Sequence, residues 1–222
     1  MAAIGILEKA RTWTDEEIVE RVKSGETALY EILMRRYNQR LYRVTVSIVR
    51  DSSEAEDVMQ DAYVRAYGHL EQFAGRAPFS AWLMRIAVNE ALARVRQRNQ
   101  KEPLGEEGAE EVSMKNIDTA LDPEQKAASA ETAELLETAI LRLPEQYRTV
   151  VMLRDVEEMS TKETADALEL SEQNVKVRLH RGHAIMRNWL LTRVGAGGKK
   201  AFPFMGERCD LVVSRVMDLL QA

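Results

Sequence analysis

Several features that point to common classes of protein are scarce or absent in this sequence. The 222 residues include one cysteine, Cys209, which excludes an internal disulfide and a cysteine-rich zinc site. No run of about 18 apolar residues is present, so we expect no membrane insertion. The N-terminal residues lack the basic start and apolar stretch of a secretion signal. These absences make a cytoplasmic globular protein the default expectation.

Proline is also rare, with five residues, and no segment alternates apolar and polar residues as a strand does. Almost every segment instead has helical periodicity, and Thr14-x-x-Glu17, Ser53-x-x-Glu56 and Ser160-x-x-Glu163 are capping-box signatures. Asp122-Pro123 is typical of a further helix start. We therefore predict an all-α fold, with helices near 15–24, 27–50, 54–71, 79–98, 124–141, 145–157, 161–168, 172–192 and 207–220.

The helical pattern is interrupted at residues 101–123, which are rich in acids and have no apolar period. We expect an acidic flexible linker there, joining two small helical domains at 1–100 and 124–193. The glycines of 195–198 indicate a hinge within a final segment, 194–222, that carries a short amphipathic helix.

The net charge of −5 is unusual for a nucleic-acid-binding protein, but the basic residues are concentrated in two segments. Residues 174–193 contain five Lys or Arg and no acid, and a second cluster consists of Arg94, Arg96, Arg98 and Lys101. Because local charge governs binding, two basic patches on an acidic chain are compatible with DNA contact.

Two short helical patterns meet at a tight turn, Glu169-Leu170-Ser171, and predict a helix-turn-helix in the C-terminal domain. On its second helix, Val175, Leu179, Gly182 and Met186 form the stripe that should face the core. Gly182 inside a helix indicates close packing at that point.

The opposite side of this helix carries the side chains positioned to reach base edges: Gln173, Lys176, Val177, His180 and Arg181. Ser171 is a good N-cap, and Arg178 lies nearer the core boundary, where a phosphate contact is expected. The alternative is a solvated basic face on an ordinary bundle. His180 and His183 have no third ligand nearby, so we expect no metal site.

A second pattern lies in residues 79–98, where Trp82, Arg85, Asn89 and Arg96 fall on one side of the helix. An aromatic ring, guanidinium groups and an amide on one face suit a splayed single strand. The preceding loop, 69–78, is expected to form a pocket for a flipped base. The alternative is that the aromatic residues belong to the core, which we favour for Phe79 and leave open for Trp82.

The helix predicted at 54–71 has a buried face of Ala55, Val58, Met59, Ala62, Ala66 and Leu70. Asp57, Gln60, Asp61 and Val64 point the other way. This acidic, slightly apolar outer face suits a basic protein surface rather than DNA, the alternative being a solvated face.

Taken together, these segments resemble the extracytoplasmic-function (ECF) sigma factors of bacterial RNA polymerase. The matching runs, in order, are DSSEAEDVMQDAYVRAYGHLEQF, FSAWLMRIAVNEALARVRQR and LPEQYRTVVMLRDVEEMSTKETADALELSEQNVKVRLHRG. The resemblance covers about residues 15–192.

The resemblance implies a role for each segment. Residues 57–70 match the motif that binds the clamp helices of the largest polymerase subunit, and residues 69–96 match the region that melts and holds the −10 element. Phe73 matches the loop that lines the flipped-base pocket, and Asn89 matches the melting helix. Residues 161–180 match the −35 reader, with Arg154, Lys176, His180 and Arg181 on its DNA-contacting positions.

The same resemblance implies further partners: the flap of the second-largest polymerase subunit, promoter DNA and an anti-sigma factor. It implies no cofactor and no catalytic activity. A stand-alone helix-turn-helix regulator would need a dimer interface, and the single-strand face at 79–98 argues against it. An enzyme using Glu54, Asp57 and Asp61 lacks a convergent base, nucleophile or metal set.

Overall fold

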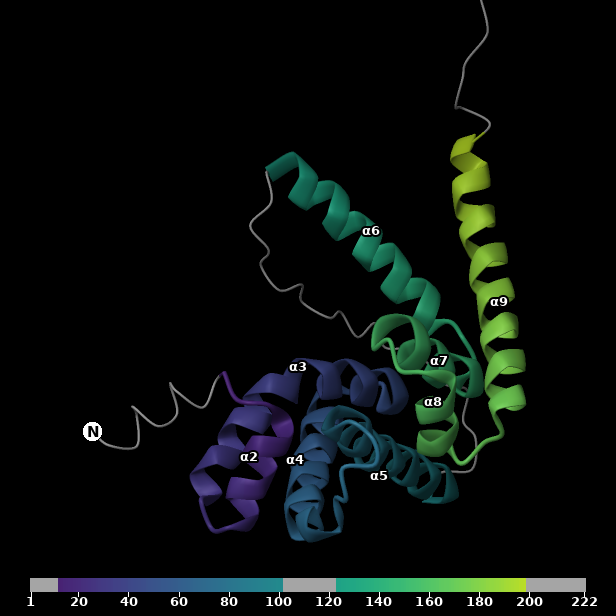
Figure 1. Ribbon diagram of the computed structural model, residues 1–222. Coiled ribbons are helices and arrows are strands. Elements are labelled where there is room, and N and C mark those ends of the chain that lie inside the picture. Colours follow the sequence, from purple (N-terminus) through teal and green to yellow (C-terminus); the bar gives the residue numbers. More distant parts are fainter. Residues whose placement is uncertain (1–11, 102–122, 199–222) are drawn as a thin grey trace, which may run out of the picture.

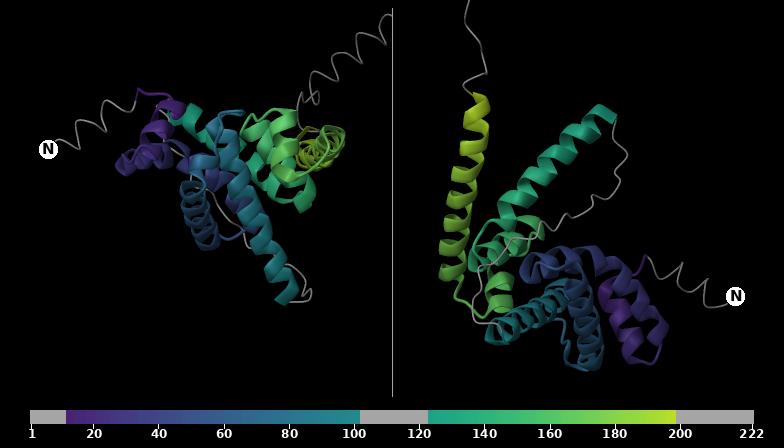
Figure 2. Two further views of the ribbon diagram at one scale, coloured as in Figure 1. Left: turned by 60° about the horizontal axis from the view of Figure 1, so that its bottom comes forward. Right: turned by 180° about the vertical axis from the view of Figure 1, so that it is seen from behind.

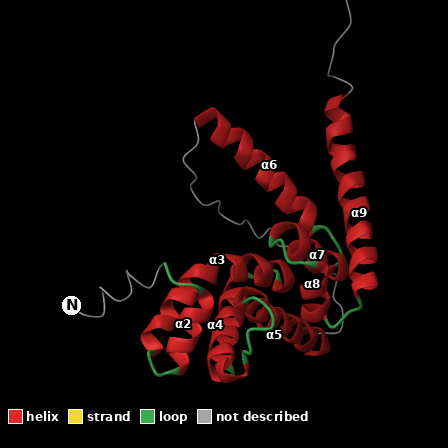
Figure 3. Cartoon of the chain, in the orientation of Figure 1, coloured by secondary structure: helices red, strands yellow, loops and turns green. Residues whose placement is uncertain are grey.

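The computed structural model describes residues 12–101 and 123–198, and every regular element in these two ranges is helical (Figures 1 and 3). The all-α prediction is therefore confirmed. The helix predicted at 207–220, Cys209 and residues 102–122 of the predicted linker lie outside the described residues. Within the described ranges no helix combines the length and hydropathy needed to cross a membrane.

The N-terminal part consists of four α-helices and two short 3-10 turns. They are α2 (Asp15–Lys23), η1 (Thr27–Leu29), α3 (Tyr30–Val49), α4 (Ser52–Gly68), η2 (Leu70–Gln72) and α5 (Phe79–Lys101). The C-terminal part follows with α6 (Pro123–Leu141), α7 (Glu145–Val151), the π-helical segment η3 (Met152–Val156), α8 (Thr161–Leu168) and α9 (Glu172–Gly198).

Helix starts follow two of the three predicted capping boxes. Thr14 caps α2 and Ser160 caps α8, each with the reciprocal bond from a glutamate three residues later. The box predicted at Ser53 is wrong: Asp51 is the N-cap of α4, and its carboxylate accepts from the backbone N–H of Glu54 at 2.7 Å. A carboxylate caps as well as a hydroxyl does, so the helix starts before Ser53.

The helix predicted at 145–157 changes its hydrogen bonding partway along. After α7 the backbone widens into η3, where the N–H of Glu157 donates to the carbonyl of Met152 at 2.9 Å, five residues earlier. Such π-helical widening re-aims the residues at its end. Glu157, which follows this segment directly, is buried, with only 3% of the residue exposed.

The N-terminal core lies between α3, α4 and α5, which pack against one another. Tyr30 and Tyr63 link α3 to α4: the Tyr30 hydroxyl donates to the Tyr63 carbonyl at 2.9 Å, and the Tyr63 hydroxyl donates to the Met34 carbonyl at 3.1 Å. Burial raises the pKa of both phenols well above its ordinary value, so they remain donors at any physiological pH.

In the C-terminal part, α9 packs against α7 and α8, as the predicted stripe requires. Val175 and Gly182 are buried and Leu179 and Met186 are half-buried. A Cβ atom at Gly182 would lie 2.8 Å from Cγ2 of Val151, closer than any real contact. The glycine is therefore required by the close approach of α9 to α7.

The two parts also pack against each other, which the pattern of two linked domains did not predict. Helix α8 lies against α5, and α7 and η3 lie against α3 (Figures 1 and 2). Across the same junction, hydrogen bonds from Arg40 and Arg43 of α3 to Glu157 join residues more than a hundred positions apart in the chain.

Candidate nucleic-acid interface

The outward face of α9 carries the basic side chains that the sequence placed there. Gln173, Lys176, Val177, His180 and Arg181 are exposed, and Arg178 is half-buried. Glu169 ends α8 in the left-handed conformation, with φ of 54°, which produces the predicted turn. The Ser171 hydroxyl then accepts from the N–H of Asn174 at 3.2 Å and caps the first turn of α9.

The charges on this face are available to a ligand. Within the described residues Lys176, His180 and Arg181 form no ion pair, whereas His183 contacts Asp155 of η3 at 2.6 Å. Arg154, also on η3, immediately precedes Asp155 in the sequence and is half-buried. A helix with a capped, exposed N-terminus and unpaired cations is suited to the major groove of duplex DNA.

The face predicted on α5 alternates between exposed and half-buried side chains. Arg85 and Arg96 are exposed, and Trp82 and Asn89 are half-buried. In the part of the chain that the structure describes, neither arginine forms an ion pair. Two cations and an amide on one side of α5 can hold a phosphate backbone and read one base edge.

The second basic cluster is smaller than its sequence suggested. Arg94 binds Asp61 at 2.8 Å and Arg98 binds Glu54 at 3.0 Å, so α5 uses these cations to hold α4. Arg98 also donates to the carbonyl of Val49 at 3.0 Å. Charge counting along the sequence cannot detect this neutralisation, because the paired residues are more than thirty positions apart.

An aromatic cluster supports the loop before α5. Phe79 is fully buried, which confirms the sequence interpretation, and its ring lies 5.5 Å from Phe73 and 5.7 Å from Trp82. The structure places Phe73 in this core, with 6% exposed. Lys23 of α2 donates to the Phe73 carbonyl at 3.1 Å. The cluster thus anchors one end of the loop, while residues 74–78 are exposed.

The outer face of α4 is open to solvent. Asp57, Gln60, Asp61 and Val64 are all exposed, and Val64 is 74% exposed, the highest value for a large apolar side chain among the described residues. Tyr67, which the sequence reasoning missed, is 42% exposed on the same helix three residues later. The i, i+3 spacing of Tyr67 from Val64 could have placed Tyr67 on this outer face from the sequence. An exposed apolar pair beside acids is typical of a protein-binding surface.

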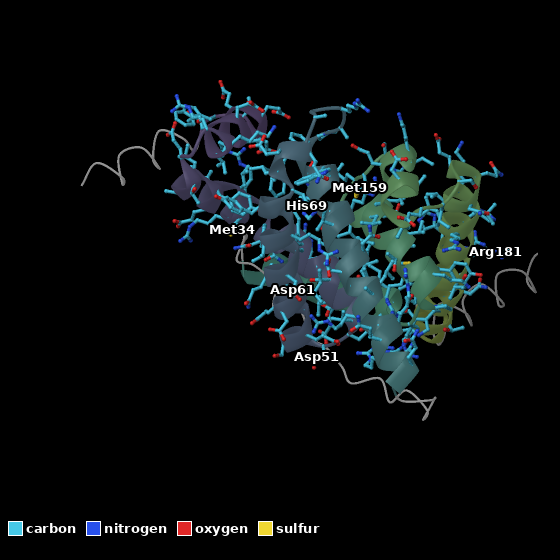
Figure 4. The ribbon with its side chains drawn as sticks, turned by 90° about the horizontal axis from the view of Figure 1, so that it is seen from below. Met34, Asp51, Asp61, His69, Met159 and Arg181 are labelled. Atoms are coloured by element: carbon cyan, nitrogen blue, oxygen red, sulfur yellow. The ribbon has the colours of Figure 1, made fainter. Side chains whose placement is uncertain are left out.

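The candidate side chains therefore lie on three helices: on the outer face of α4, on the face of α5 that carries Asn89, and on the outer face of α9. In Figure 4, Asp61 lies on the N-terminal part of the molecule and Arg181 lies at its edge on α9. No group of three metal-binding side chains occurs in residues 12–101 and 123–198.

Two family models match the chain. Residues 33–101 match Sigma-70 region 2, and residues 133–184 match Sigma-70, region 4. The first match holds the faces on α4 and α5, and the second holds the helix-turn-helix.

Curated relatives agree with this division over most of the chain. The ECF RNA polymerase sigma factor SigW of Bacillus subtilis is 32% identical over 177 residues, which cover 78% of this chain and 94% of the relative. The RNA polymerase sigma-H factor of Pseudomonas aeruginosa is 32% identical, covering 75% and 89%. The ECF RNA polymerase sigma-E factor of Escherichia coli is 30% identical, covering 79% and 93%.

Solved structures are similar as well. CnrH, in complex with the cytosolic domain of CnrY, has a TM-score of 0.57 and 26% identity, covering 79% of this chain and 96% of that one. The sigma factor RpoE of Bartonella quintana, in complex with the anti-sigma factor NepR, has a TM-score of 0.58 with 19% identity and coverage of 72% and 96%, a likeness of fold.

Proposed function

The chain belongs to the ECF sigma factors of bacterial RNA polymerase, and we propose that it recognises both promoter elements and stabilises the melted −10 strand. As a member of this family it is an initiation factor for promoter-specific transcription rather than an enzyme. The observation that supports the finer proposal best is the presence of two separate nucleic-acid faces, one suited to duplex and one to single-stranded DNA, on one chain.

In this proposal the 124–193 domain reads the −35 duplex. Gln173, Lys176, Val177, His180 and Arg181 face the base edges, while Arg154, Ser171 and Arg178 contact phosphates or set the helix position. Val177 is 37% exposed and apolar, so it can contact a thymine methyl but cannot donate to guanine.

In the same proposal the 1–100 domain binds the −10 element. Arg85 and Arg96 hold the backbone of the displaced strand, Asn89 reads a base edge, and the half-buried Trp82 offers its ring for stacking. Phe73 acts from the core, as the support of the loop that receives the flipped base.

Protein partners complete the proposal. Asp57, Gln60, Asp61 and Val64 bind the clamp helices of the largest polymerase subunit, and the 124–193 domain binds the flap of the second-largest subunit. Residues 101–123 form the linker that joins the domains. An anti-sigma factor holds the protein inactive; CnrH, the 26% identical relative, was solved with a second protein bound. The site of action is the cytoplasm, where the polymerase is.

The direct test is transcription in vitro with purified core polymerase and a library of genomic fragments. Core alone should give no promoter-directed transcripts, and addition of the chain should produce defined start sites preceded by a shared pair of elements. Absence of defined start sites at any ratio of chain to core would contradict the proposal.

Arg181→Ala is expected to weaken recognition at one −35 position by about 1–3 kcal/mol, because a bidentate guanidinium contact to one base is lost. The measurement is binding of the holoenzyme to a set of single-base variants of the −35 element. Arg187→Ala is a matched control, since Arg187 is exposed on the same helix beyond the reading segment. An equal loss on every variant would instead make Arg181 a phosphate contact.

Asn89→Ala is expected to reduce open-complex formation about tenfold while core binding is unchanged, because one base-reading hydrogen bond of about 1–1.5 kcal/mol is removed. Melting is followed with a fluorescent base analogue in the −10 element, and core binding by titration. Asn99→Ala, at an exposed position near the end of α5, is the control. Normal melting by the Asn89 variant would show that the Asn89 side chain does not contact a base of the −10 strand.

A further inference from the structure

The loop before α5 is exposed along its whole length, from Ala74 to Pro78. At Gly75 the chain turns with φ of 67°, and a Cβ added there would meet nothing within 4 Å. A short exposed loop has little packing of its own, so its conformation depends on the residues at its two ends. The question is therefore how Phe73 and Phe79, which flank the loop, are held.

The C-terminal end of the loop is fixed by the start of α5. The carbonyl of Pro78 accepts from the backbone N–H of Ala81 at 3.0 Å and from that of Trp82 at 3.2 Å. Phe79, the first residue of the helix, is 0% exposed. Ordinary bonds of a helix N-terminus thus hold this end of the loop.

The N-terminal end is held by a residue fifty positions earlier in the chain. Lys23, the last residue of α2, donates from Nζ to the backbone carbonyl of Phe73 at 3.1 Å. The same ammonium group lies 6.0 Å from the centroid of the Phe73 ring, at the limit of a cation–π attraction. A hydrogen bond from an ammonium group is charge-assisted and stronger than one between neutral groups. Lys23 therefore binds the residue from which the loop departs.

The burial of Lys23 sets it apart from an ordinary surface lysine. Its side chain is only 15% exposed, whereas that of Glu20, its ion-pair partner at 3.0 Å, is 72% exposed. An ion pair with so exposed a partner contributes little to stability. A lysine that loses most of its hydration needs acceptors inside the protein, and the Phe73 carbonyl supplies one.

Helix α2 is a firm support for this contact. Ile18 and Val19 are 0% exposed, Asp15 pairs with Arg36 of α3, and the helix packs against α3, η1 and η2. A cation on a packed helix positions its partner more precisely than one on a loop. The helix also lies before residues 33–101, so the match to Sigma-70 region 2 does not include this contact.

We propose that Lys23 is a positioning residue for −10 recognition: it fixes the carbonyl of Phe73 and so holds the loop 74–78 in the conformation that receives a flipped base. The anchoring stands on the contacts above, and the step from anchoring to recognition rests on the proposed function. Lys23 acts through the loop and not on the base itself. Its loss therefore changes which base the loop accepts, rather than the hold on the DNA backbone.

The anchoring is tested first on the full chain without DNA or polymerase. In a Cys209→Ser background, Ala77→Cys provides an exposed site in the loop for a spin label, whose mobility is measured by electron resonance. Lys23→Met removes the ammonium group but keeps a side chain of similar length, and it should mobilise the label. Lys23→Arg restores a charged donor and should return most of the immobilisation. Equal mobility in the unaltered and Lys23→Met chains would overturn the anchoring.

Glu20→Gln is the matched control for the surface ion pair. It removes the charge that pairs with Lys23 and leaves the bond from Lys23 to Phe73 in place. We expect no change in the mobility of the label and almost none in the unfolding midpoint. If Glu20→Gln mobilised the label as much as Lys23→Met does, the effect would belong to the surface pair, and the proposal would be wrong.

The recognition step is measured with the holoenzyme on promoters that carry each of the four bases at each −10 position. The unaltered chain should melt promoters with one base at the flipped position in strong preference to the others. Lys23→Met should reduce that preference about tenfold with core binding unchanged, because the loop loses one charge-assisted bond, whereas Lys23→Arg should keep most of it. An equal loss of melting for all four bases would overturn the positioning role.

The salt dependence of promoter binding separates positioning from direct contact with the displaced strand. Removal of a lysine that neutralises one phosphate lowers the salt slope by about one. Lys23→Met should leave the slope unchanged, whereas Arg85→Ala, which removes a proposed phosphate contact, should lower it by about one. A decrease for Lys23→Met equal to that for Arg85→Ala would make Lys23 a phosphate contact and contradict the proposal.

The two sets of measurements also distinguish this proposal from the proposed function. Mobilisation of the loop by Lys23→Met, with no promoter-dependent melting by the unaltered chain, would contradict the proposed function and leave the anchoring in place. Normal melting with normal base preference by the Lys23→Met chain would overturn the role of Lys23 in recognition and leave the sigma function intact.

Discussion

Phe79→Ala is expected to lower the free energy of unfolding by about 3–5 kcal/mol, the cost of removing a fully buried aromatic side chain from a close-packed core. Phe79 is 0% exposed and contacts the rings of Tyr37 at 5.9 Å, Phe73 at 5.5 Å and Trp82 at 5.7 Å. Its loss leaves a cavity under the loop before α5. Denaturant unfolding followed by circular dichroism measures the change.

The same substitution should also impair −10 melting at temperatures where the protein remains folded, since the loop loses its internal support. Tyr67→Ala is the control for removal of an aromatic ring: Tyr67 is 42% exposed, and its truncation should cost about 1 kcal/mol or less. Equal costs for the two variants would show that Phe79 is not the centre of the aromatic cluster.

Gly182→Ala is expected to destabilise the protein by about 1–2 kcal/mol, although alanine favours helix formation by about 1 kcal/mol over glycine. The added Cβ would lie 2.8 Å from Cγ2 of Val151, a side chain that is 1% exposed. Valine in a helix has one strongly preferred rotamer, so it cannot turn away without strain. Helix α9 must then shift, and promoter binding should weaken together with stability.

Gly68→Ala provides the matched control at the end of α4, where an added Cβ meets nothing within 4 Å. Here the helix propensity of alanine acts alone, and a small gain of about 0.5 kcal/mol is expected. The two Gly→Ala variants should therefore shift the unfolding midpoint in opposite directions. A gain in both would mean that α9 and α7 relax apart without cost.

Much of the local structure follows from residues close together in the chain. The capping boxes at Thr14 and Ser160, the turn at Glu169 and the buried stripe of α9 each depend on side chains within one or two helical turns. The error at Ser53 arose among equally local choices: Asp51 and Ser53 are both good caps, and the sequence alone does not say which one the helix uses.

The availability of the basic side chains for DNA does not follow from the local sequence in this way. Arg94 and Arg98 look like part of a nucleic-acid patch in the sequence, yet they bind Asp61 and Glu54 of α4. Arg85, Arg96, Lys176 and Arg181 look the same in the sequence and remain exposed without an ion pair in the described residues. Burial and pairing of a charge depend on the neighbouring helix, which periodicity does not identify.

The sequence by itself determined that the protein is all-helical, that it carries a helix-turn-helix, and that it belongs to the ECF sigma factors, because local periodicity, caps and short motifs carry these properties. Only the tertiary structure decided which cations are free, why α9 needs Gly182, and that the two domains pack against each other. The bonds from Glu157 to Arg40 and Arg43 span 117 and 114 residues. Contacts over such separations depend on how the whole chain packs, so no local sequence pattern predicts them.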